Sequence, residues 1–306
     1  MSDAPVVDAV ELRTVVPATA LQDLEPLLWL LSPSGMLTED AGCLGARDLA
    51  PELCRISLYV APMEVDGALE SLRAELQRLG IAAEIACRDV AREDWNRVWK
   101  QHFRPFTAGR RIRIEPSWMQ GPDVPGVVRI AIDPGLAFGT GTHETTRLAL
   151  CTVEDWADTS RENGLDLSSI TMLDVGTGSA ILCILAVMLG VGHAIGTEID
   201  EDAVDSAGDN LQINHLSDRI ELVLAEDPGT VPGAPFGLVV ANIISSVLLS
   251  LKDRLVAATA PGGSLVLSGI LLREVDDVAA AFAATGLQLV RTSQDGEWAS
   301  LWWRRP

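Results

Sequence analysis

The chain has 306 residues, of which 48% are hydrophobic, so it is too long for one small core and we expect two globular units. Its 43 acidic and 23 basic residues give a formal net charge of −20. This charge argues against direct binding to nucleic acid, because no basic excess exists to displace the counterions of a phosphate backbone. A basic protein is the partner that the charge favours.

The cysteines and histidines exclude further classes of protein. Five cysteines are scattered along the chain without a Cys-x-x-Cys pair, and the histidines have no metal-ligand spacing. The N-terminal residues carry early acids and no basic stretch followed by an apolar core, and the apolar run 181–191 is too short to span a bilayer. We expect a cytoplasmic protein without a metal, a disulfide framework or a membrane segment. As its oligomeric state we expect a monomer.

Residues 7–90 predict a small α+β unit. Apolar alternation predicts strands over 7–16 and 54–61, and the helical pattern over 21–31 predicts a helix between them. An amphipathic helix over 66–80 then ends at a glycine. The full order of strand, helix, strand, strand, helix, strand is typical of a ferredoxin-like unit, and its residues favour docking or scaffolding over chemistry.

The sequence REDWNRVWKQHFRPF contains Trp95 and Trp99 one helical turn apart, which places them on one face of a helix. Such an aromatic stripe is more often packing between domains than a ligand contact. We therefore predict a first domain at 1–90, a linker helix at 91–106 and a larger domain at 107–306. The linker is expected to act as a hinge between the two domains.

From about residue 168 onward, short β-branched runs alternate with helical stretches, which is the pattern of a doubly wound α/β sheet. The crossovers between parallel strands should be right-handed. The predicted strands cover 172–175, 193–199, 220–225, 238–243, 264–270 and 287–292, with a last strand near 298–303. Open α/β sheets bind ligands at the carboxyl ends of their strands, so the residues that follow these strands are the candidates for a site.

A glycine loop follows the first of these strands. Residues 176–180 (GTGSA) lead directly into an apolar helix. Gly176 and Gly178 let the backbone approach a ligand closely, and the helix offers unpaired N–H groups to an anion. A dinucleotide site would need a third glycine where Ile181 stands, so nicotinamide or flavin binding is disfavoured.

Two polar residues end later strands. Glu198 lies about twenty residues beyond the glycine loop and supplies a carboxylate where a ribose diol would lie. Asp200 is better explained as the N-cap of the next helix. Asn242 ends another strand, where its carbonyl oxygen could hold an amine, although an asparagine in such a turn is also a common cap. We take Glu198 as the ribose-binding residue, and both explanations of Asn242 stay open at this point.

Residues 133–146, with the sequence DPGLAFGTGTHETT, form a glycine-rich loop that opens a helix. Ordering its glycines costs backbone entropy, so a plain surface loop explains it poorly. We expect a lid or floor for a cofactor, with Phe138 near the reacting group and with Thr146 in contact with the ligand. His143 is more consistent with a structural role than with a general base, and the sequence offers no dedicated general base.

Together these motifs resemble the ribosomal protein L11 methyltransferase family. The resemblance runs from about Glu93 to Trp298 and rests on DWNRVWKQHFRPF, DPGLAFGTGTHETT, LDVGTGSAIL, GTEID, ANI and LSGIL. Members of that family join a ferredoxin-like substrate-recognition domain to a seven-stranded, Rossmann-like class I methyltransferase domain. The resemblance implies the same α/β architecture here. It also implies S-adenosyl-L-methionine as the cofactor, with its carboxylate at the glycine loop.

The resemblance assigns roles to individual residues. The implied cofactor contacts are Thr146, Gly176, Glu198 and Asn242, to which the same motifs add Thr142, Asp174 and Gly178. Asn242 and Phe138 are the expected catalytic residues.

The chain departs from the family's usual pattern at three places. Glu144 stands where the family has proline, Glu198 where it has aspartate, and GTGSA where it has GCGSG. These changes are chemically mild, because alanine is small and glutamate keeps the carboxylate.

The implied reaction transfers a methyl group from S-adenosylmethionine to a neutral amine, on lysine side chains or the N-terminus of ribosomal protein L11. A second hypothesis keeps the chemistry and changes the target, for instance to lysines of the electron-transfer flavoprotein β subunit. Its methyltransferases resemble this catalytic domain but generally lack the N-terminal one. A third hypothesis is a non-catalytic cofactor-binding module, which the intact loop at 133–146 and Asn242 disfavour.

Overall fold

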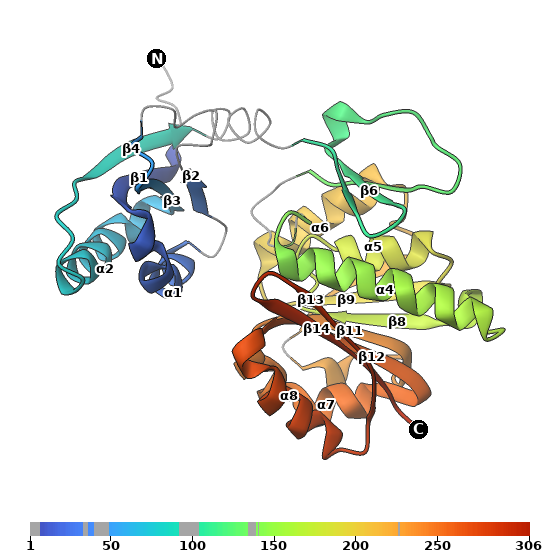
Figure 1. Cartoon of the computed structure of the whole chain (residues 1–306). Coiled ribbons are helices and arrows are strands. Elements are labelled where there is room, and N and C mark those ends of the chain that lie inside the picture. Colours follow the sequence, from blue (N-terminus) through green and yellow to red (C-terminus); the bar gives the residue numbers. More distant parts are fainter. Residues whose placement is uncertain are drawn as a thin grey trace. The chain divides into compact units, whose positions relative to one another are not determined.

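The computed structural model describes residues 7–32, 36–39, 49–91, 104–133, 139, 141–225 and 227–306. The chain divides into two compact units, Met1–Phe103 and Arg104–Pro306 (Figure 1). Most of the predicted linker helix lies outside the described residues, including Trp95 and Trp99. The linker, its hinge and the exact domain limits therefore stay predictions.

The first unit is an antiparallel sheet with two helices. Its strands are β1 (Val7–Pro17), β2 (Met36–Glu39), β3 (Leu53–Val60) and β4 (Ile85–Ala91), its helices are α1 (Leu21–Leu31) and α2 (Val65–Arg78), and 3-10 turns lie at Ala18–Ala20 and Pro62–Glu64. Among the described residues, the strands lie in the order β2-β3-β1-β4. This order confirms the predicted ferredoxin-like α+β fold.

The alternation of apolar and polar side chains along β1 and β3 decides which face of this sheet is buried. Leu12 pairs with Leu58 across the two strands, and both side chains are fully buried. They belong to one cluster with Leu28 of α1 and Leu72 of α2. Each buried leucine contributes roughly 1.5–3 kcal/mol of transfer free energy, so this shared face holds the two helices on the sheet.

The second unit contains a small sheet and a large one. The small sheet has β5 (Phe106–Ala108), β6 (Ile112–Glu115) and β7 (Val128–Ala131). The large sheet has β8 (Thr171–Val175), β9 (His193–Glu198), β10 (Ile220–Leu224), β11 (Phe236–Asn242), β12 (Thr259–Leu271), β13 (Gln288–Asp295) and β14 (Trp298–Arg304). The helices are α4 (Glu144–Glu162), α5 (Ile181–Met188), α6 (Glu201–Ile213), α7 (Ser245–Ala258) and α8 (Val275–Ala283), with 3-10 turns at Ser117–Met119, Leu167–Ser169, Pro228–Thr230 and Leu272–Glu274. The sequence analysis did not predict the small sheet.

In the described part of the chain, the large sheet has the order β10-β9-β8-β11-β12-β14-β13. Its first five strands are parallel, and β14 runs antiparallel to both β12 and β13. Helices α4, α5 and α6 cover one face and α7 and α8 the other (Figure 1). This confirms the predicted seven-stranded, doubly wound sheet, although β12 begins at Thr259 and so before the predicted start at 264. The chain order reverses between β8 and β11, where such sheets place their ligands.

Helix α5 is buried along nearly its whole length, from Ile181 to Val187. It is short, and none of the described helices is long and apolar enough to cross a membrane.

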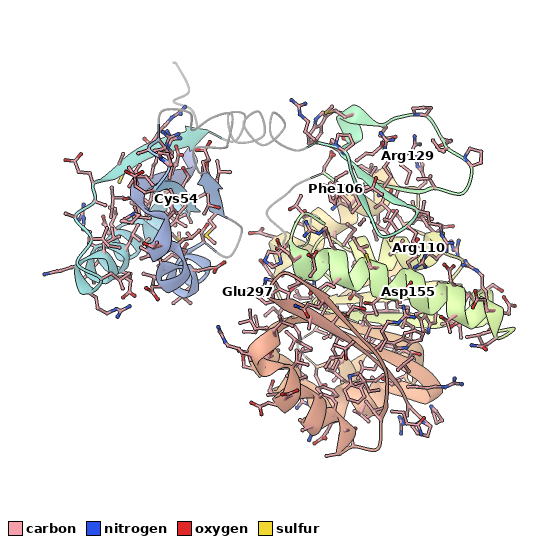
Figure 2. All side chains as sticks on the ribbon, in the orientation of Figure 1. Cys54, Phe106, Arg110, Arg129, Asp155 and Glu297 are labelled. Carbon is pink, nitrogen blue, oxygen red and sulfur yellow. The ribbon has the colours of Figure 1, made fainter. Side chains whose placement is uncertain are left out.

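Ion pairs hold α4 on the small sheet. Buried Glu154 accepts hydrogen bonds from the backbone N–H groups of Arg110 (2.9 Å) and Arg111 (3.2 Å), in the turn between β5 and β6. The Arg110 guanidinium also pairs with Asp155 and Asp158, whose hydrogen bonds raise the pKa of Arg110 above its usual range. Figure 2 shows Arg110 beside Asp155. The small sheet therefore anchors the long helix whose first turn enters the candidate site.

A glycine lets β12 pack closely against the segment that follows β11. Gly269 has a φ of +82°, and an added Cβ would lie 2.6 Å from the carbonyl oxygen of Ile243. Ile243 directly follows Asn242, which pairs with Ser268 of β12. The missing side chain at position 269 therefore allows the ends of two strands to approach each other where Asn242 lies.

Gly269→Ala should lower the free energy of unfolding by about 2–4 kcal/mol, because overpacking against a backbone oxygen adds to the strain of a left-handed conformation. Gly262→Ala is the matched control, since Gly262 has a φ of +75° and no neighbouring atom within 4 Å of an added Cβ. The control should lose about 1 kcal/mol. Urea unfolding measures both values, and equal losses would contradict the importance of the close approach at Gly269.

Candidate functional site

The glycine loop between β8 and α5 is held in a left-handed backbone conformation. Gly176, Gly178 and Ala180 have φ values of +70°, +52° and +62°. The N–H of Gly176 donates to the carbonyl oxygen of Thr197 at 2.9 Å, which attaches the loop to β9. An added Cβ at Gly176 would lie 2.8 Å from Cγ2 of Ile243. The loop therefore fits between the ends of β9 and β11 only without a side chain at this position.

Ala180 shows how the loop keeps its shape with one glycine fewer than the family pattern. A left-handed conformation costs a residue with a Cβ about 1 kcal/mol more than glycine. The Ala180 side chain is fully buried, which contributes about 0.8 kcal/mol and offsets most of that strain. The alanine is thus compatible with the same turn into α5.

Glu198, the predicted ribose-binding residue, lies directly against the glycine loop. Its Oε2 accepts a hydrogen bond from the N–H of Gly178 at 2.9 Å, and its Oε1 accepts one from the N–H of Ile199 at 2.8 Å. Each carboxylate oxygen has a second lone pair, so the group can still accept hydrogen bonds from a diol. The structure therefore brings Gly178 and Glu198 together at the ends of β8 and β9.

Asp174 lies beneath the glycine loop and is fully buried. Its Oδ2 accepts hydrogen bonds from Oγ1 of Thr177 (2.8 Å) and Sγ of Cys183 (3.7 Å), while its Oδ1 has no partner among the described residues. Burial raises the pKa of Asp174 to about 7, an effect that these hydrogen bonds oppose and the charge of Glu198 reinforces. This carboxyl is thus the buried support of the loop.

Cys183 has its thiol in this same buried cluster. Burial is the main reason that the pKa of Cys183 lies well above its ordinary value. The thiol therefore stays protonated and acts as a donor in the core. Among the described residues, no group of three or more histidine, cysteine, aspartate or glutamate side chains is placed to hold a metal ion.

Asn242 and Thr146 meet across the site, although 96 positions separate them in the chain. Nδ2 of Asn242 donates to Oγ1 of Thr146 at 3.4 Å, and Thr146 is almost fully buried in the first turn of α4. Oδ1 of Asn242 is buried and has no hydrogen-bond partner in the described part of the chain. A buried carbonyl oxygen without a donor is costly, so this atom is available to a ligand.

The upstream loop is described only in part. Residues 134–138 and 140 lie outside the described residues, so the expected position of Phe138 remains a prediction. The carbonyl oxygen of Gly139 accepts a hydrogen bond from Oγ of Ser179 at 2.7 Å, which joins this loop to the glycine loop. Thr142 is exposed, and its carbonyl oxygen accepts a hydrogen bond from Arg147.

The sequence analysis missed Asn210, a buried residue of α6 that connects the two loops. Its Nδ2 donates to the carbonyl oxygen of Ser179 (3.2 Å), and its Oδ1 accepts from the N–H of Asp133 (2.9 Å). One turn later, Asn214 bonds both backbone groups of Ala131. Two asparagines four residues apart, the first in α6 and the second at its C-cap, were the available signal, because that spacing places both amides on one face.

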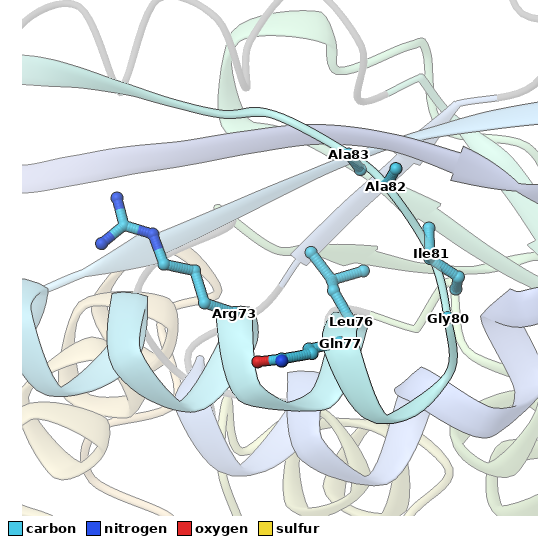
Figure 3. A pocket seen from close by; sticks show the side chains of 7 residues that line it. All are labelled: Arg73, Leu76, Gln77, Gly80, Ile81, Ala82 and Ala83. Carbon is cyan, nitrogen blue, oxygen red and sulfur yellow. The ribbon is translucent and has the colours of Figure 1, made fainter.

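An open groove of about 320 Å³ lies in the first unit, at the end of α2 (Figure 3). Leu76 and Ile81 supply apolar surface, and Arg73 and Gln77 supply polar groups. None of the candidate residues for the cofactor or the acceptor lines this groove.

Comparison with known proteins identifies the family. The family model described as "Ribosomal protein L11 methyltransferase (PrmA)" matches residues 33–306. The chain belongs to this family. A ribosomal protein L11 methyltransferase from Pelobacter propionicus is 36% identical over 96% of this chain and 97% of its own length. One from Azotobacter vinelandii is 38% identical over 91% of this chain and 92% of its own.

A solved structure of the family has the same fold. The ribosomal protein L11 methylase of Lactobacillus delbrueckii subsp. bulgaricus is 30% identical, with a TM-score of 0.59. The match covers 67% of this chain and all of that one.

Asp174→Asn should make the free energy of unfolding less dependent on pH. The pKa of Asp174 is about 7 in the folded chain, and its ordinary value is 3.8. Between pH 3.8 and pH 7 the folded chain therefore holds a proton that the unfolded chain has lost. The contribution of Asp174 to the free energy of unfolding falls as the pH rises through this range. The stability of the variant relative to the wild type should therefore increase by about 2.5 kcal/mol from pH 5 to pH 8. Denaturant unfolding at several pH values measures this, and a constant difference would contradict it.

Proposed function

We propose that this chain transfers methyl groups from S-adenosylmethionine to amines of ribosomal protein L11, at lysine side chains, the N-terminal amine or both. Its membership of the L11 methyltransferase family supports the methyltransferase activity, the cofactor and the target. The observation that carries the acceptor site is the buried Oδ1 of Asn242 at the carboxyl edge of the sheet, which has no hydrogen-bond partner among the described residues.

The described residues fit the cofactor. When bound, S-adenosylmethionine supplies a methyl group already activated by the sulfonium. The positive φ values of Gly176 and Gly178 hold the loop in its tight turn, and α5 begins directly after the loop with N–H groups that favour a carboxylate. Glu198 keeps lone pairs for a ribose diol at the next strand end. These features support Gly176, Gly178 and Glu198 as cofactor-binding residues, with Asp174 supporting the loop from below.

Asn242 is the group we propose for the acceptor. Its Oδ1 can accept a hydrogen bond from the N–H of an amine, which directs the nitrogen lone pair away from Asn242. Holding a nucleophile in line with its target can supply roughly 7–11 kcal/mol of the barrier reduction. Proximity is therefore the main contribution required of this chain, because the donor needs no further activation.

The acceptor amine must be neutral, whereas a lysine has an ordinary pKa of about 10.4. Apolar surroundings lower the pKa of an amine by disfavouring its charged form. Ile244, two residues after Asn242, is 61% exposed, and Val247 in the next turn is 38% exposed. These side chains would be covered by an incoming polypeptide, and we propose that they help to desolvate its amine.

The other parts of the proposal concern the partner. The ferredoxin-like unit is proposed to recognise the protein substrate, and the segment 91–106 to allow it to present several amines. The net charge of −20 would attract a basic protein, and it supports activity without direct nucleic-acid contact. A ribosomal protein substrate supports a cytoplasmic location. The electron-transfer flavoprotein remains a weaker alternative, because the relatives named above carry the ribosomal protein in their names.

Incubating ribosomal protein L11 with this chain and S-adenosylmethionine should add mass in steps of one methylene group, measured by intact-mass spectrometry. Asn242→Ala should lower the initial rate at least about a hundredfold, because the amine loses its positioning hydrogen bond. Peptide mapping of the product identifies the modified amines and tests the lysine assignment.

Asn163→Ala is the control, since Asn163 is an exposed asparagine at the C-cap of α4 and should leave the rate unchanged. No mass gain with the wild-type chain, when calorimetry shows that S-adenosylmethionine binds, would reject ribosomal protein L11 as the target. Full activity in Asn242→Ala would reject the acceptor site.

A further inference from the structure

The first turn of α4 touches the ends of three strands of the large sheet. Oγ of Ser268 on β12 donates to the carbonyl oxygen of Thr145 at 2.8 Å. Nδ2 of Asn242 on β11 donates to Oγ1 of Thr146 at 3.4 Å. The ring of Trp298, at the start of β14, meets the ring of His143 edge to face, with centroids 5.3 Å apart and an interplanar angle of 68°. The position of this turn is therefore set from several sides.

His143 is the N-cap of α4, and its side chain accepts the hydrogen bond that begins the helix. Its Nδ1 accepts from the N–H of Thr145 at 3.2 Å and lies 2.8 Å from Oγ1 of the same residue. A ring nitrogen that accepts from a backbone N–H carries no proton, so the neutral ring has its proton on Nε2. Neither nitrogen then has a free lone pair to serve as a general base.

Arg147, the residue after Thr146, attaches the same turn of α4 to the hairpin between β13 and β14. The Arg147 guanidinium pairs with Asp295 at 2.8 Å, lies 3.7 Å from Glu144 and donates to the carbonyl oxygen of Thr142. Because Asp295 and Trp298 flank one hairpin, both attachments depend on the same element.

In this structure the donor end of the Asn242 amide faces Thr146. An amide has a donor end and an acceptor end. With Nδ2 directed to Thr146, the other end is the buried Oδ1 that has no partner among the described residues. If the first turn of α4 shifted, the amide could rotate and present its N–H₂ group, which repels the N–H of an amine.

We propose that His143 is a positioning residue for methyl transfer: by capping α4 it holds Thr146 against Asn242, so that Oδ1 of Asn242 faces the acceptor amine. This inference rests on the proposed function of Asn242. The role assigned to His143 is indirect, because its side chain acts through Thr146.

Three substitutions separate the two contacts of His143. His143→Asn keeps a cap acceptor and removes the ring, His143→Phe keeps a ring for Trp298 and removes the acceptor, and His143→Ala removes both. The proposal requires kcat to fall about tenfold in the phenylalanine and alanine variants, and to stay within about threefold of wild type in the asparagine variant, since asparagine is among the best cap residues. Equal kcat values in all three variants would overturn it, as would rescue by phenylalanine alone.

A double-mutant cycle on kcat tests whether His143 acts through Thr146. Thr146→Val removes the hydroxyl with little change of shape. Thr146→Ser keeps a hydroxyl and should therefore keep kcat. In the Thr146→Val background, His143→Ala should lower kcat by less than about twofold, because the effects of substitutions within one chain of contacts are not additive. Full additivity, with thermal midpoints showing that all variants fold, would mean that His143 is only a structural cap.

A readout without turnover keeps this inference distinct from the proposed function. The side-chain amide resonance of Asn242, assigned by its loss in Asn242→Ala, should move in His143→Phe and His143→Ala and stay in place in His143→Asn. An unmoved resonance in all three variants would overturn the inference, even if ribosomal protein L11 is methylated. Failure of methylation with the expected resonance pattern would reject the target and leave the positioning of Asn242 supported.

Discussion

The parallel pairing of β8 with β9 and β11 is the constraint on which the candidate site depends. Val175, near the end of β8, pairs with Thr197 on one side and Ala241 on the other. The next residue in each of the three segments therefore lies at the same edge of the sheet. These three residues are Gly176, Glu198 and Asn242. Backbone hydrogen bonds in the sheet thus align a close-approach glycine, a carboxylate and an amide without any contact between their side chains.

Above this edge, the loops are joined to one another by hydrogen bonds from small polar side chains. Ser179 bonds the upstream loop, and Asn210 bonds both the glycine loop and the end of that upstream segment. Most buried polar groups in a folded protein are paired, so unpaired ones among the described residues are informative. The unpaired oxygen atoms of Asp174 and Asn242 lie where a ligand and its support would need them. The rest of the unit is stabilised by an apolar core that includes Phe236, Phe282 and Trp303.

The large sheet and the ferredoxin-like order were predictable because their strands are apolar runs with clear breaks. The small sheet was not, since β5 and β6 are too short for a periodic signal and their position depends on distant partners. Glu154 illustrates how burial can depend on a distant partner and not on the local sequence. In the sequence it is one acid among many, yet it is fully buried because the turn between β5 and β6 supplies two N–H groups to it.

The sequence by itself determined the family motifs, the glycines that permit close approach, and the polar residues that follow β8, β9 and β11. It could do so because each of these signals lies within one short segment. Only the tertiary structure decided that Thr146 holds the amide of Asn242, that Asp174 is buried with Cys183, and that His143 meets Trp298. The first and the last of these contacts join segments far apart in the chain, and the second joins β8 to the helix that follows it. Their existence depends on how the strands pair and how α4 packs across them, which no local pattern of residues specifies.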